Sequence, residues 1–503
     1  MKDGGSEEIK GPVTPGSSLA VDDVPSHTLF HSEMSASAFV DTPFSSYLSS
    51  KMAAPQPTIN DLAAKISELS AEFTRFLGEN KIPQPTFAAD SVTSYDGLTS
   101  EAFLLRQKLL DAATDLSYLV SGPSESIFNY THNCMPDATA LNILNHFDFW
   151  SVVPLEGSAS YADIAKHTDL PEEVVHRVLE HAYTLRIFEE TDPTKPLTTR
   201  VRHTARSAAL AKNGGLRALV AALMNDAGPP MTVLHAALEK FQRGRTELRE
   251  DMSETAFALY HSGALCGGYG NSWELLENDG EGENKGWRQR NFVQFMNYIK
   301  EIFRLEGLVN TAYDWKAAGD LSVVDLGGSG GHDSFVLAKN FPNLKITVQD
   351  LPNCQSSFDK NIPEELKGRV AFQAHSFFEP QPLQADLYMI KLILHDWPDA
   401  ESVKILQGLR PALRPGAKVL FIDYVGKQGD VEENAAAAAA LPKSIQQMGT
   451  STDLRMMALF SAKERPVDAW RQLFKKADER YELKRVEANP LSFFVIIEAV
   501  WRG

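Results

Sequence analysis

The chain of 503 residues carries 49 Lys and Arg against 66 Asp and Glu, a formal net charge of −17, and 43% of its residues are hydrophobic. This balance is typical of a globular protein of two or three domains, and the negative charge opposes binding to nucleic acid or to anionic membranes over the surface as a whole. Three widely spaced cysteines form neither a disulfide framework nor a zinc pattern. We find neither a secretory h-region nor an apolar run long enough to cross a bilayer, so we expect a cytoplasmic protein.

Residues 1–55 are rich in Ser, Gly, Pro and acidic side chains, a composition that predicts a disordered N-terminal extension. Apolar residues then recur at steps of three and four, which predicts an amphipathic helix over residues 59–76. A second helix is predicted from Ser100 to Tyr118. Together these helices carry more apolar surface than one small subdomain can cover, so we expect a homodimer. The stripe of the first helix consists of Ile59, Leu62, Ile66, Leu69, Phe73 and Phe76.

Residues 160–192 predict a short helix, a turn at 169–171, a second helix and a strand-like end. This is the outline of a helix-turn-helix with a wing, a unit that often binds DNA. The second helix, however, carries Glu172, Glu173 and Glu180, which match phosphate groups poorly. Nucleic acid is therefore not an expected partner.

The remaining sequence divides into a helical part and an alternating part. Residues 205–310 are predicted to be mainly helical, which gives a helical region over 56–310 and a second domain over 311–503. In the second domain, short apolar runs alternate with helical segments, so we expect a parallel sheet covered by helices on both faces. The last two runs, within 481–500, predict an antiparallel hairpin that turns at Asn489–Pro490. The parallel strands are predicted at 321–328, 345–351, 369–374, 385–394 and 418–425.

The first turn of the alternating part is rich in glycine, with Gly327, Gly328, Gly330 and Gly331. Glycines let the backbone approach a ligand closely, although a tight turn without a ligand would use them equally well. The second strand ends at Asp350, where a carboxylate commonly accepts hydrogen bonds from a ribose. The turn and Asp350 together favour a cofactor that contains a nucleoside.

The fourth strand is predicted to run directly into His395 and Asp396. An imidazole and a carboxylate at the carboxyl end of a parallel strand lie where such sheets bind ligands and perform chemistry. No group of His, Asp and Glu residues in the sequence indicates a metal site, and we expect none.

Three stretches resemble one enzyme family: "VVDLGGSGGHDSFVLAKNFPNLKITVQDLP", "LHDWPDAESVKIL" and "SAKERPVDAWRQLF". They are similar to S-adenosylmethionine-dependent O-methyltransferases of the plant phenolic and fungal secondary-metabolite type. The resemblance is strong over 321–500 and extends in architecture over 56–310. It implies a Rossmann-like methyltransferase sheet with a C-terminal antiparallel hairpin, and an N-terminal helical dimerisation domain that contains a winged-helix-like unit. It also implies S-adenosylmethionine as the cofactor.

The resemblance assigns catalytic roles to three residues. His395 matches the general base that removes a proton from a hydroxyl of a small-molecule acceptor, and the unperturbed pKa of imidazole near neutrality suits this role. Asp423 matches an acidic residue that orients the base, although the plant enzymes have Glu there. Glu464 matches a second acidic residue beside the imidazole.

The same resemblance predicts cofactor and substrate contacts. Ser376 stands where the family usually has Asp, so its hydrogen bond to adenine would lack charge assistance. The side chains expected at the acceptor are thioethers and an aromatic ring, which suit a flat apolar ring system. The predicted cofactor residues are Gly327, Gly328, Asp350, Ser376, Phe377 and Lys391, and the predicted substrate residues are Phe292, Met296, Met456 and Met457.

Three functions remain open on the sequence. The first is methylation of a hydroxyl on a small aromatic or polyketide-like metabolite. The second is a pericyclase, because some fungal relatives of this fold bind S-adenosylmethionine yet catalyse cyclisation or ene-type reactions; Lys391 and His395 would then polarise a carbonyl. The third is a regulator that uses the winged-helix-like segment, which the acidic balance disfavours.

Overall fold

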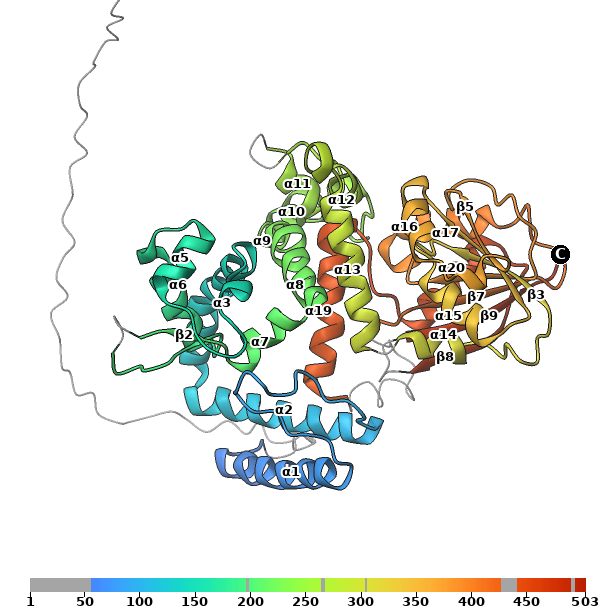
Figure 1. Ribbon diagram of the computed structural model, residues 1–503. Coiled ribbons are helices and arrows are strands. Elements are labelled where there is room, and N and C mark those ends of the chain that lie inside the picture. Colours follow the sequence, from blue (N-terminus) through green and yellow to red (C-terminus); the bar gives the residue numbers. More distant parts are fainter. Residues whose placement is uncertain (1–55, 196–198, 264–266, 304, 427–440, 490–493) are drawn as a thin grey trace, which may run out of the picture. The chain divides into compact units, whose positions relative to one another are not determined.

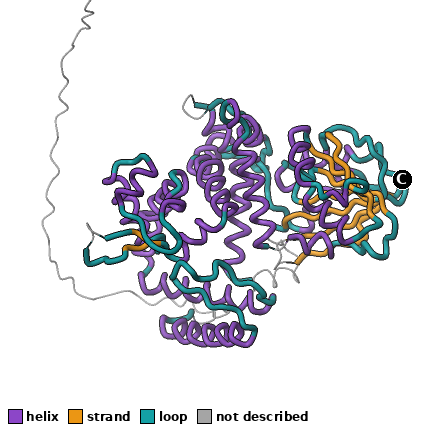
Figure 2. Tube along the Cα trace, viewed as in Figure 1, coloured by secondary structure: helices purple, strands orange, loops and turns teal. Residues whose placement is uncertain are grey.

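A computed structural model describes residues 56–503 except 196–198, 264–266, 304, 427–440 and 490–493. The predicted disordered extension 1–55 lies outside the described residues. Residues 57–503 form one unit, in which helices dominate up to about residue 311 and the main sheet follows (Figure 1, Figure 2). The predicted boundary at 310/311 stays a prediction. No helix of the described part is long and apolar enough to cross a membrane.

Two long helices open the described chain, as predicted. α1 (Ile59–Glu79) begins at Thr58, whose side chain and Asp61 form a reciprocal capping box. α1 packs on α2 (Ser100–Ser121) and buries one apolar face, which includes Leu69 and Phe73. Burial of that stripe, rather than helix propensity, supplies most of the stability of such a pair.

The next elements match the predicted order of helix, turn, helix and strand. They are α3 (Pro123–His146), α4 (Phe149–Val152), α5 (Tyr161–Thr168) and α6 (Glu172–Thr184), followed by the antiparallel pair β1 (Glu189–Glu190) and β2 (Val201–Arg202). Their shared core contains Trp150, Ile164, Leu179 and Phe188. The assignment of this segment as a winged-helix-like unit stays a prediction.

The rest of the helical part consists of short helices. They are α7 (Ala205–Lys212), α8 (Gly214–Ala221), a π-helical segment (Ala222–Ala227), α9 (Gly228–Thr232), α10 (Leu234–Phe241), α11 (Ala256–His261), α12 (Ser272–Asn278), α13 (Trp287–Ile302) and α14 (Leu305–Thr311), with 3-10 turns at Met252–Glu254 and Gly282–Asn284. A much later helix, α19 (Lys443–Phe460), returns to pack against α2, α9 and α11 (Figure 1). The two parts of the chain are therefore interleaved.

The main sheet has seven described strands in the order β5-β4-β3-β6-β7-β9-β8. β3 to β7 are parallel, β9 is antiparallel to β7, and β8 is antiparallel to β9, which confirms the predicted sheet and hairpin. The predicted turn at Asn489–Pro490 falls partly outside the described residues. The strands are β3 (Leu321–Leu326), β4 (Leu344–Asp350), β5 (Val370–Ala374), β6 (Leu387–Lys391), β7 (Lys418–Tyr424), β8 (Tyr481–Asn489) and β9 (Phe494–Trp501).

Both faces of the sheet are buried, as the continuous apolar strands predicted. One core gathers Trp470 and Phe474 against β6, β7 and β9; the other gathers Leu337 and Phe358 against β3, β4 and β6. The helices are α15 (His332–Asn340), α16 (Gln355–Asn361), α17 (Asp399–Gly408) and α20 (Val467–Ala477), with 3-10 turns at Pro352–Cys354 and Glu364–Leu366. Residues 375–386 between β5 and β6 form a loop, where strict alternation predicted a helix.

The fourth strand ends earlier than predicted. β6 stops at Lys391, Leu392 has a left-handed φ of 55°, and a 3-10 turn covers Leu394–Asp396. His395 therefore lies on a turn after the strand and not at the strand end. The reason is local, because the carboxylate of Asp423 accepts the backbone N–H groups of Leu394 and His395 and so draws the chain out of the ladder.

Candidate functional site

A cavity of about 1100 Å³ opens above the carboxyl ends of the parallel strands. This is the edge at which open parallel sheets bind ligands, beside β3, where the strand order reverses. Asp423 and Met457 are not among its lining residues. The predicted residues that line it are Phe292, Met296, Gly327, Gly328, Asp350, Ser376, Phe377, Lys391, His395, Met456 and Glu464.

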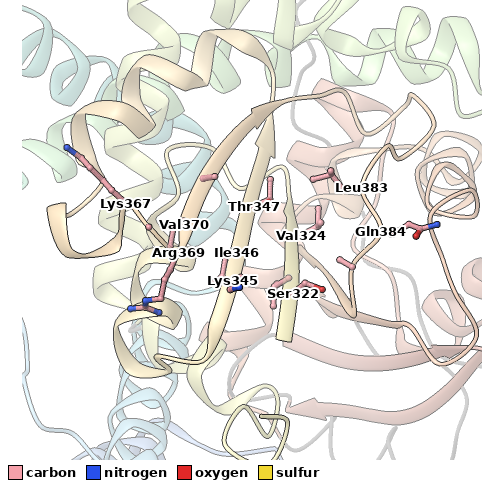
Figure 3. A pocket seen from close by; sticks show the side chains of 14 residues that line it. Ser322, Val324, Lys345, Ile346, Thr347, Lys367, Arg369, Val370, Leu383 and Gln384 are labelled. Carbon is pink, nitrogen blue, oxygen red and sulfur yellow. The ribbon is translucent and has the colours of Figure 1, made fainter. Parts of the chain in front are cut away.

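A second, smaller pocket of about 300 Å³ lies at the opposite edge of the sheet (Figure 3). It is formed where the strands begin, at Ser322, Lys345 and Val370, and no predicted site residue lines it. We therefore place the chemistry in the larger cavity.

The glycine-rich turn needs its glycines for close packing. Gly327 has a φ of 68°, and a Cβ atom there would lie 2.5 Å from Cδ1 of Ile393. A Cβ atom on Gly328 would lie 2.6 Å from Oδ2 of Asp325, the buried carboxyl at the end of β3. Only glycine therefore allows this turn to pass so close to β3 and to the loop after β6, and its backbone forms part of the cavity wall.

Asp350 ends β4 as predicted, and its carboxylate is already partly bonded. Oδ2 accepts the N–H of Ser329 at 2.8 Å and Oδ1 accepts the N–H of Leu351 at 2.7 Å. Two carboxylate oxygens offer about four lone pairs, so capacity remains for a ligand hydroxyl. Glu277 of α12 also lines the cavity; its burial, and then the charge of Asp350, raise the pKa of Glu277. Nothing in the local sequence distinguishes Glu277, because only the fold brings α12 to this edge.

Lys391 lies at the end of β6 in a buried charge cluster. Its Nζ is 2.7 Å from Oδ2 of Asp333 on α15, and Nζ of Lys300 on α13 is 3.6 Å from the same oxygen. Burial alone would raise the pKa of Asp333, but the two lysines outweigh it and lower the pKa. The other carboxylate oxygen of Asp333 is buried without a hydrogen-bond partner. An orphaned buried oxygen beside a lysine fits the charged amino-acid end of the predicted cofactor.

The loop after β5 carries the residues that were predicted to contact adenine. Oγ of Ser376 accepts the N–H of Phe378 at 3.3 Å, so part of its capacity is used within the loop. The ring of Phe377 meets Trp397 edge to face, with centroids 5.8 Å apart. Nε2 of the neighbouring His375 is buried without a partner. An aromatic wall with an unpaired ring nitrogen fits a heterocyclic base.

His395 and Glu464 meet as predicted. Nδ1 of His395 lies 3.2 Å from Oε1 of Glu464, and both side chains are buried. Because a carboxylate only accepts hydrogen bonds, Nδ1 carries a proton and Nε2 is left for an acceptor. The nearest carboxylate to Nε2 is Asp396, whose Oδ1 is 3.6 Å away. Asp396 is the next residue after the predicted base, but its contact with the imidazole ring was not predicted.

Among the described residues, the hydrogen bonds of Asp423 go to the backbone and not to the imidazole ring. Its Oδ2 accepts the N–H of Leu394 at 3.0 Å and of His395 at 3.3 Å, and its Oδ1 accepts the N–H of Tyr424 at 2.8 Å. No hydrogen bond links Asp423 to the imidazole within the described residues. It thus fixes the turn that carries His395, which is a less direct form of the orienting role that was expected.

The charge environment of His395 differs from the expected near-neutral titration. Burial alone would lower the pKa of His395, but Asp396, Glu464 and Asp423 together outweigh it and raise the pKa to about 10. Burial raises the pKa of Asp396 and of Asp423 to about 6, against the opposing charge of His395. The neighbouring carboxylates therefore favour the protonated form of the ring, against the effect of its burial.

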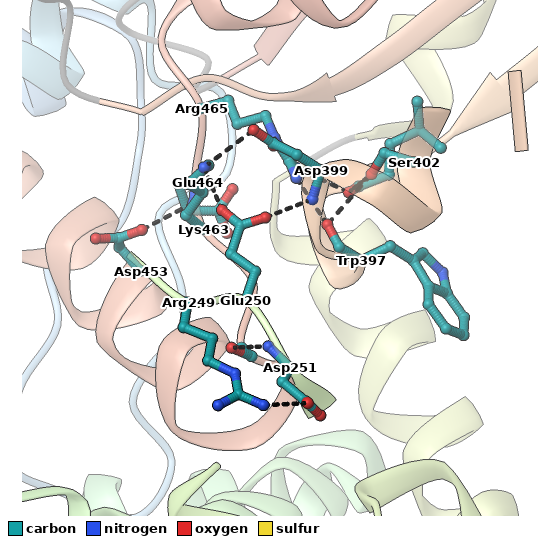
Figure 4. Close-up of polar contacts among 12 residues, drawn as sticks. Arg249, Glu250, Asp251, Trp397, Asp399, Ser402, Asp453, Lys463, Glu464 and Arg465 are labelled. Carbon is teal, nitrogen blue, oxygen red and sulfur yellow. Dashed lines mark hydrogen bonds and ion pairs between the residues drawn. The ribbon is translucent and has the colours of Figure 1, made fainter. Parts of the chain in front are cut away.

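A buried arginine fixes the two loops that form this dyad (Figure 4). Arg465 donates to the carbonyl oxygen of Leu394 at 2.9 Å and to that of Trp397 at 2.7 Å, on either side of His395. It also bonds Oδ1 of Asp399 at 2.7 Å. Because Arg465 directly follows Glu464, one guanidinium sets both partners relative to each other. Its role was not predicted, although it stands in the quoted "SAKERP" stretch.

The far wall of the cavity is apolar. α13 contributes Phe292 and Met296, and α19 contributes Met456, as predicted, whereas Met457 does not line the cavity. Trp273 of α12 stacks on Phe460, with centroids 5.0 Å apart. Within the described part of the chain, no group of three His, Cys, Asp or Glu residues is arranged to hold a metal ion.

The O-methyltransferase domain family matches residues 269–478. The chain is 43% identical over 448 residues to the O-methyltransferase lcsG of Purpureocillium lilacinum, across 89% of this chain and 94% of that protein. Its fold is similar to OxaC in complex with SAH and oxaline, with a TM-score of 0.64, 19% identity and coverage of 88% and 99% of the two chains. It is also similar to a pericyclic reaction enzyme, with a TM-score of 0.60, 20% identity and coverage of 80% and 95%. The chain therefore belongs to the S-adenosylmethionine-dependent O-methyltransferases, and S-adenosylmethionine is its cofactor.

Proposed function

We propose that this enzyme methylates a hydroxyl of a small aromatic or polyketide-like metabolite, with His395 as the group that takes the hydroxyl proton. The observation that carries the proposal is the buried pair of His395 and Glu464 at one wall of a large apolar cavity. Nε2 of His395 is the ring nitrogen left for the acceptor. The aromatic and thioether side chains on the far wall favour a flat apolar ring system.

The raised pKa of His395 defines how the proton moves. An ordinary phenol titrates near pH 10, close to the pKa of about 10 that the carboxylates give His395. The proton is therefore shared between two groups of similar affinity. The acceptor can bind as a phenolate beside a protonated ring, or as a phenol beside a neutral ring. Both complexes contain one proton between oxygen and ring nitrogen, so they are two forms of the same state. In either case a nucleophilic oxygen is held in place by an ion pair or a hydrogen bond.

Bound S-adenosylmethionine supplies an electrophilic methyl group. The chain itself holds the acceptor oxygen, excludes water with its apolar wall and keeps the acid–base pair rigid. Positioning of this kind is worth several orders of magnitude in rate. The proposed cofactor contacts are the turn at Gly327–Gly328, the carboxylate of Asp350, the loop at Ser376–Phe377, and Lys391 with Asp333.

A direct test uses purified protein, S-adenosylmethionine labelled in the methyl group, and a panel of phenolic and polyketide acceptors. Label in an O-methylated product is the expected result. Release of unmethylated but rearranged product, with the cofactor recovered intact, would contradict the proposal.

The second candidate is a pericyclase, and one observation favours it. An imidazolium at neutral pH is a hydrogen-bond donor, and a donor aimed at a carbonyl oxygen accelerates cyclisation and ene-type reactions. Lys391 is a weaker candidate for such a donor than expected, because Asp333 already binds its ammonium group. We therefore place methylation first.

We also propose that the protein is a homodimer. Large apolar side chains lie exposed along the end of α2 and the first half of α3. Many large exposed apolar side chains on two consecutive helices are typical of a protein–protein interface. The exposed residues are Tyr118, Leu119, Val120, Ile127, Phe128, Tyr130 and Met135.

A further inference from the structure

Among the described residues, one cation that lines the cavity has no carboxylate within ion-pair distance. Three described Lys or Arg side chains line the cavity: Lys300, Lys391 and Arg455. The two lysines share the carboxylate of Asp333. Within the described residues, no carboxylate lies within ion-pair distance of Arg455. Its guanidinium donates one hydrogen bond, from Nη2 to Oγ1 of Thr452 one turn earlier on α19, at 3.0 Å.

Arg455 is near the His395 end of the cavity. It interacts electrostatically with Tyr424 and Glu464, and the ring of Tyr424 lies 4.9 Å from that of His395, edge to face. Burial lowers the pKa of Arg455, while Tyr424 and Glu464 oppose this change. Oε1 of Glu464 already lies 3.2 Å from Nδ1 of His395. The guanidinium is thus a partly buried positive charge that lines the same cavity as His395 and interacts with Tyr424 and Glu464.

A partly buried charge without a partner is costly, and the cost is removed when a ligand supplies the opposite charge. A guanidinium has five N–H donors in a planar fork that matches a carboxylate, and among the described residues Arg455 makes one side-chain hydrogen bond. Thr452 holds the fork in place, so little side-chain entropy is lost when a ligand binds.

We propose that Arg455 binds a carboxylate of the acceptor, so that the substrates are hydroxylated carboxylic acids whose reacting hydroxyl is at His395. The inference rests on the proposed function and narrows its substrate class. Arg455 is then a specificity-determining residue. A neutral acceptor leaves its guanidinium unpaired and binds more weakly.

The test uses the positional isomers of dihydroxybenzoate, each with its methyl ester, because the spacing between the two groups is part of the question. Calorimetry on protein saturated with S-adenosylhomocysteine gives dissociation constants without methyl transfer. We expect at least one acid to bind about ten- to a hundredfold more tightly than its ester, the range of a charge-assisted hydrogen bond.

Variants then assign the preference to one side chain. Arg455→Met should bring the acid-to-ester ratio close to one, Arg455→Lys should retain part of it, and Thr452→Val should reduce it less than Arg455→Met does. Arg471→Met serves as the matched control, because Arg471 is exposed on α20 and pairs only with Asp468 among the described residues. Thermal melting of each variant confirms that the protein is folded.

Three results would overturn the inference. They are a ratio close to one for every pair in the wild-type protein, failure of both members of every pair to bind, and a ratio that survives in Arg455→Met. If Arg455→Met slows methylation of acids and esters equally and leaves the ratio unchanged, the guanidinium acts on the reacting oxygen and the carboxylate assignment is wrong. A clear binding ratio without any methyl transfer contradicts the proposed function alone.

Discussion

Nδ1 of His395 lies 3.2 Å from Oε1 of Glu464, and this contact decides which face of the imidazole is available for chemistry. The remaining oxygen of Glu464 is buried without a partner, and its backbone N–H is held by Oδ1 of Asp453 at 2.8 Å. The carboxylate is therefore fixed in place for one purpose, which is to hold a protonated Nδ1. The acceptor must then be served by Nε2.

Glu464→Gln tests this contact through the pH dependence of the enzyme. In the wild-type protein, kcat/KM for a phenolic acceptor should rise from pH 7 towards pH 10. Protonated His395 and the phenol hold two protons together, and the reactive complex forms only after one of these protons is lost. The amide removes a negative charge beside the ring, so the pKa of His395 falls and the rise levels off at lower pH. Identical pH profiles for the two proteins would show that Glu464 does not control the ring.

Arg465→Met tests whether Arg465 holds the loop of His395 and the loop of Glu464 in place. Loss of the bonds to Leu394 and Trp397 should loosen the turn that carries His395, so kcat should fall tenfold or more, while the affinity for S-adenosylmethionine changes little. Arg465→Lys should recover only part of the rate, because one ammonium group cannot reach all three acceptors.

Arg480→Met is the control for the two Arg465 variants, since Arg480 is exposed and bonds Asp478 at the surface. If Arg465→Met reduces cofactor affinity and turnover by the same factor, the arginine stabilises the whole domain and has no specific role in holding the base.

Asp350→Ala should weaken binding of S-adenosylmethionine by about ten- to a hundredfold, the range of a charge-assisted hydrogen bond. Part of that loss will come from the turn itself, because Asp350 also accepts the N–H of Ser329. Asp350→Asn separates the two effects, since it keeps an oxygen for that N–H group. Calorimetry that gives an unchanged dissociation constant for both variants would place the cofactor elsewhere.

The sheet and its site edge were predictable because buried parallel strands are continuous apolar runs, and their carboxyl ends carried distinctive residues. Gly327 and Asp350 lie where their strands end, as expected. The end of β6 was not predictable from the apolar run 385–394. It depends on Asp423, a residue of the next strand, which binds the backbone of Leu394.

Long-range contacts account for most of what the sequence did not reveal. Glu277 and Arg455 belong to helices whose local sequence carries no sign of a site, and only the return of α19 into the helical part brings Arg455 to the cavity. The pKa of His395 is another example. Imidazole titrates near neutrality by itself, and the adjacent Asp396, together with the distant Glu464 and Asp423, moves its pKa to about 10. Met457 is a residue that the sequence placed at the acceptor but that does not line the cavity, whereas its neighbour Met456 does.

Phe128→Glu tests the proposed dimer. Phe128 is 62% exposed on α3, beside other exposed apolar side chains, and a carboxylate there would be desolvated in an interface. Sedimentation should show a dimer for the wild-type protein at micromolar concentration and a monomer for the variant. Lys108→Glu, also on α2–α3 but outside the apolar set, should remain dimeric. A monomeric wild-type protein would contradict the proposal.

The rate of His395→Ala tests the central claim most directly. Methyl transfer to a phenolic acceptor at pH 9, where a neutral ring is populated, should fall by about 10²–10⁴, the contribution of a positioned base, while the affinity for S-adenosylmethionine stays nearly unchanged. The loss should be smaller for acceptors whose hydroxyl is already ionised at that pH, because no proton has to be removed. If His395→Ala methylates phenols at the wild-type rate, His395 is not the base and the proposed mechanism is wrong.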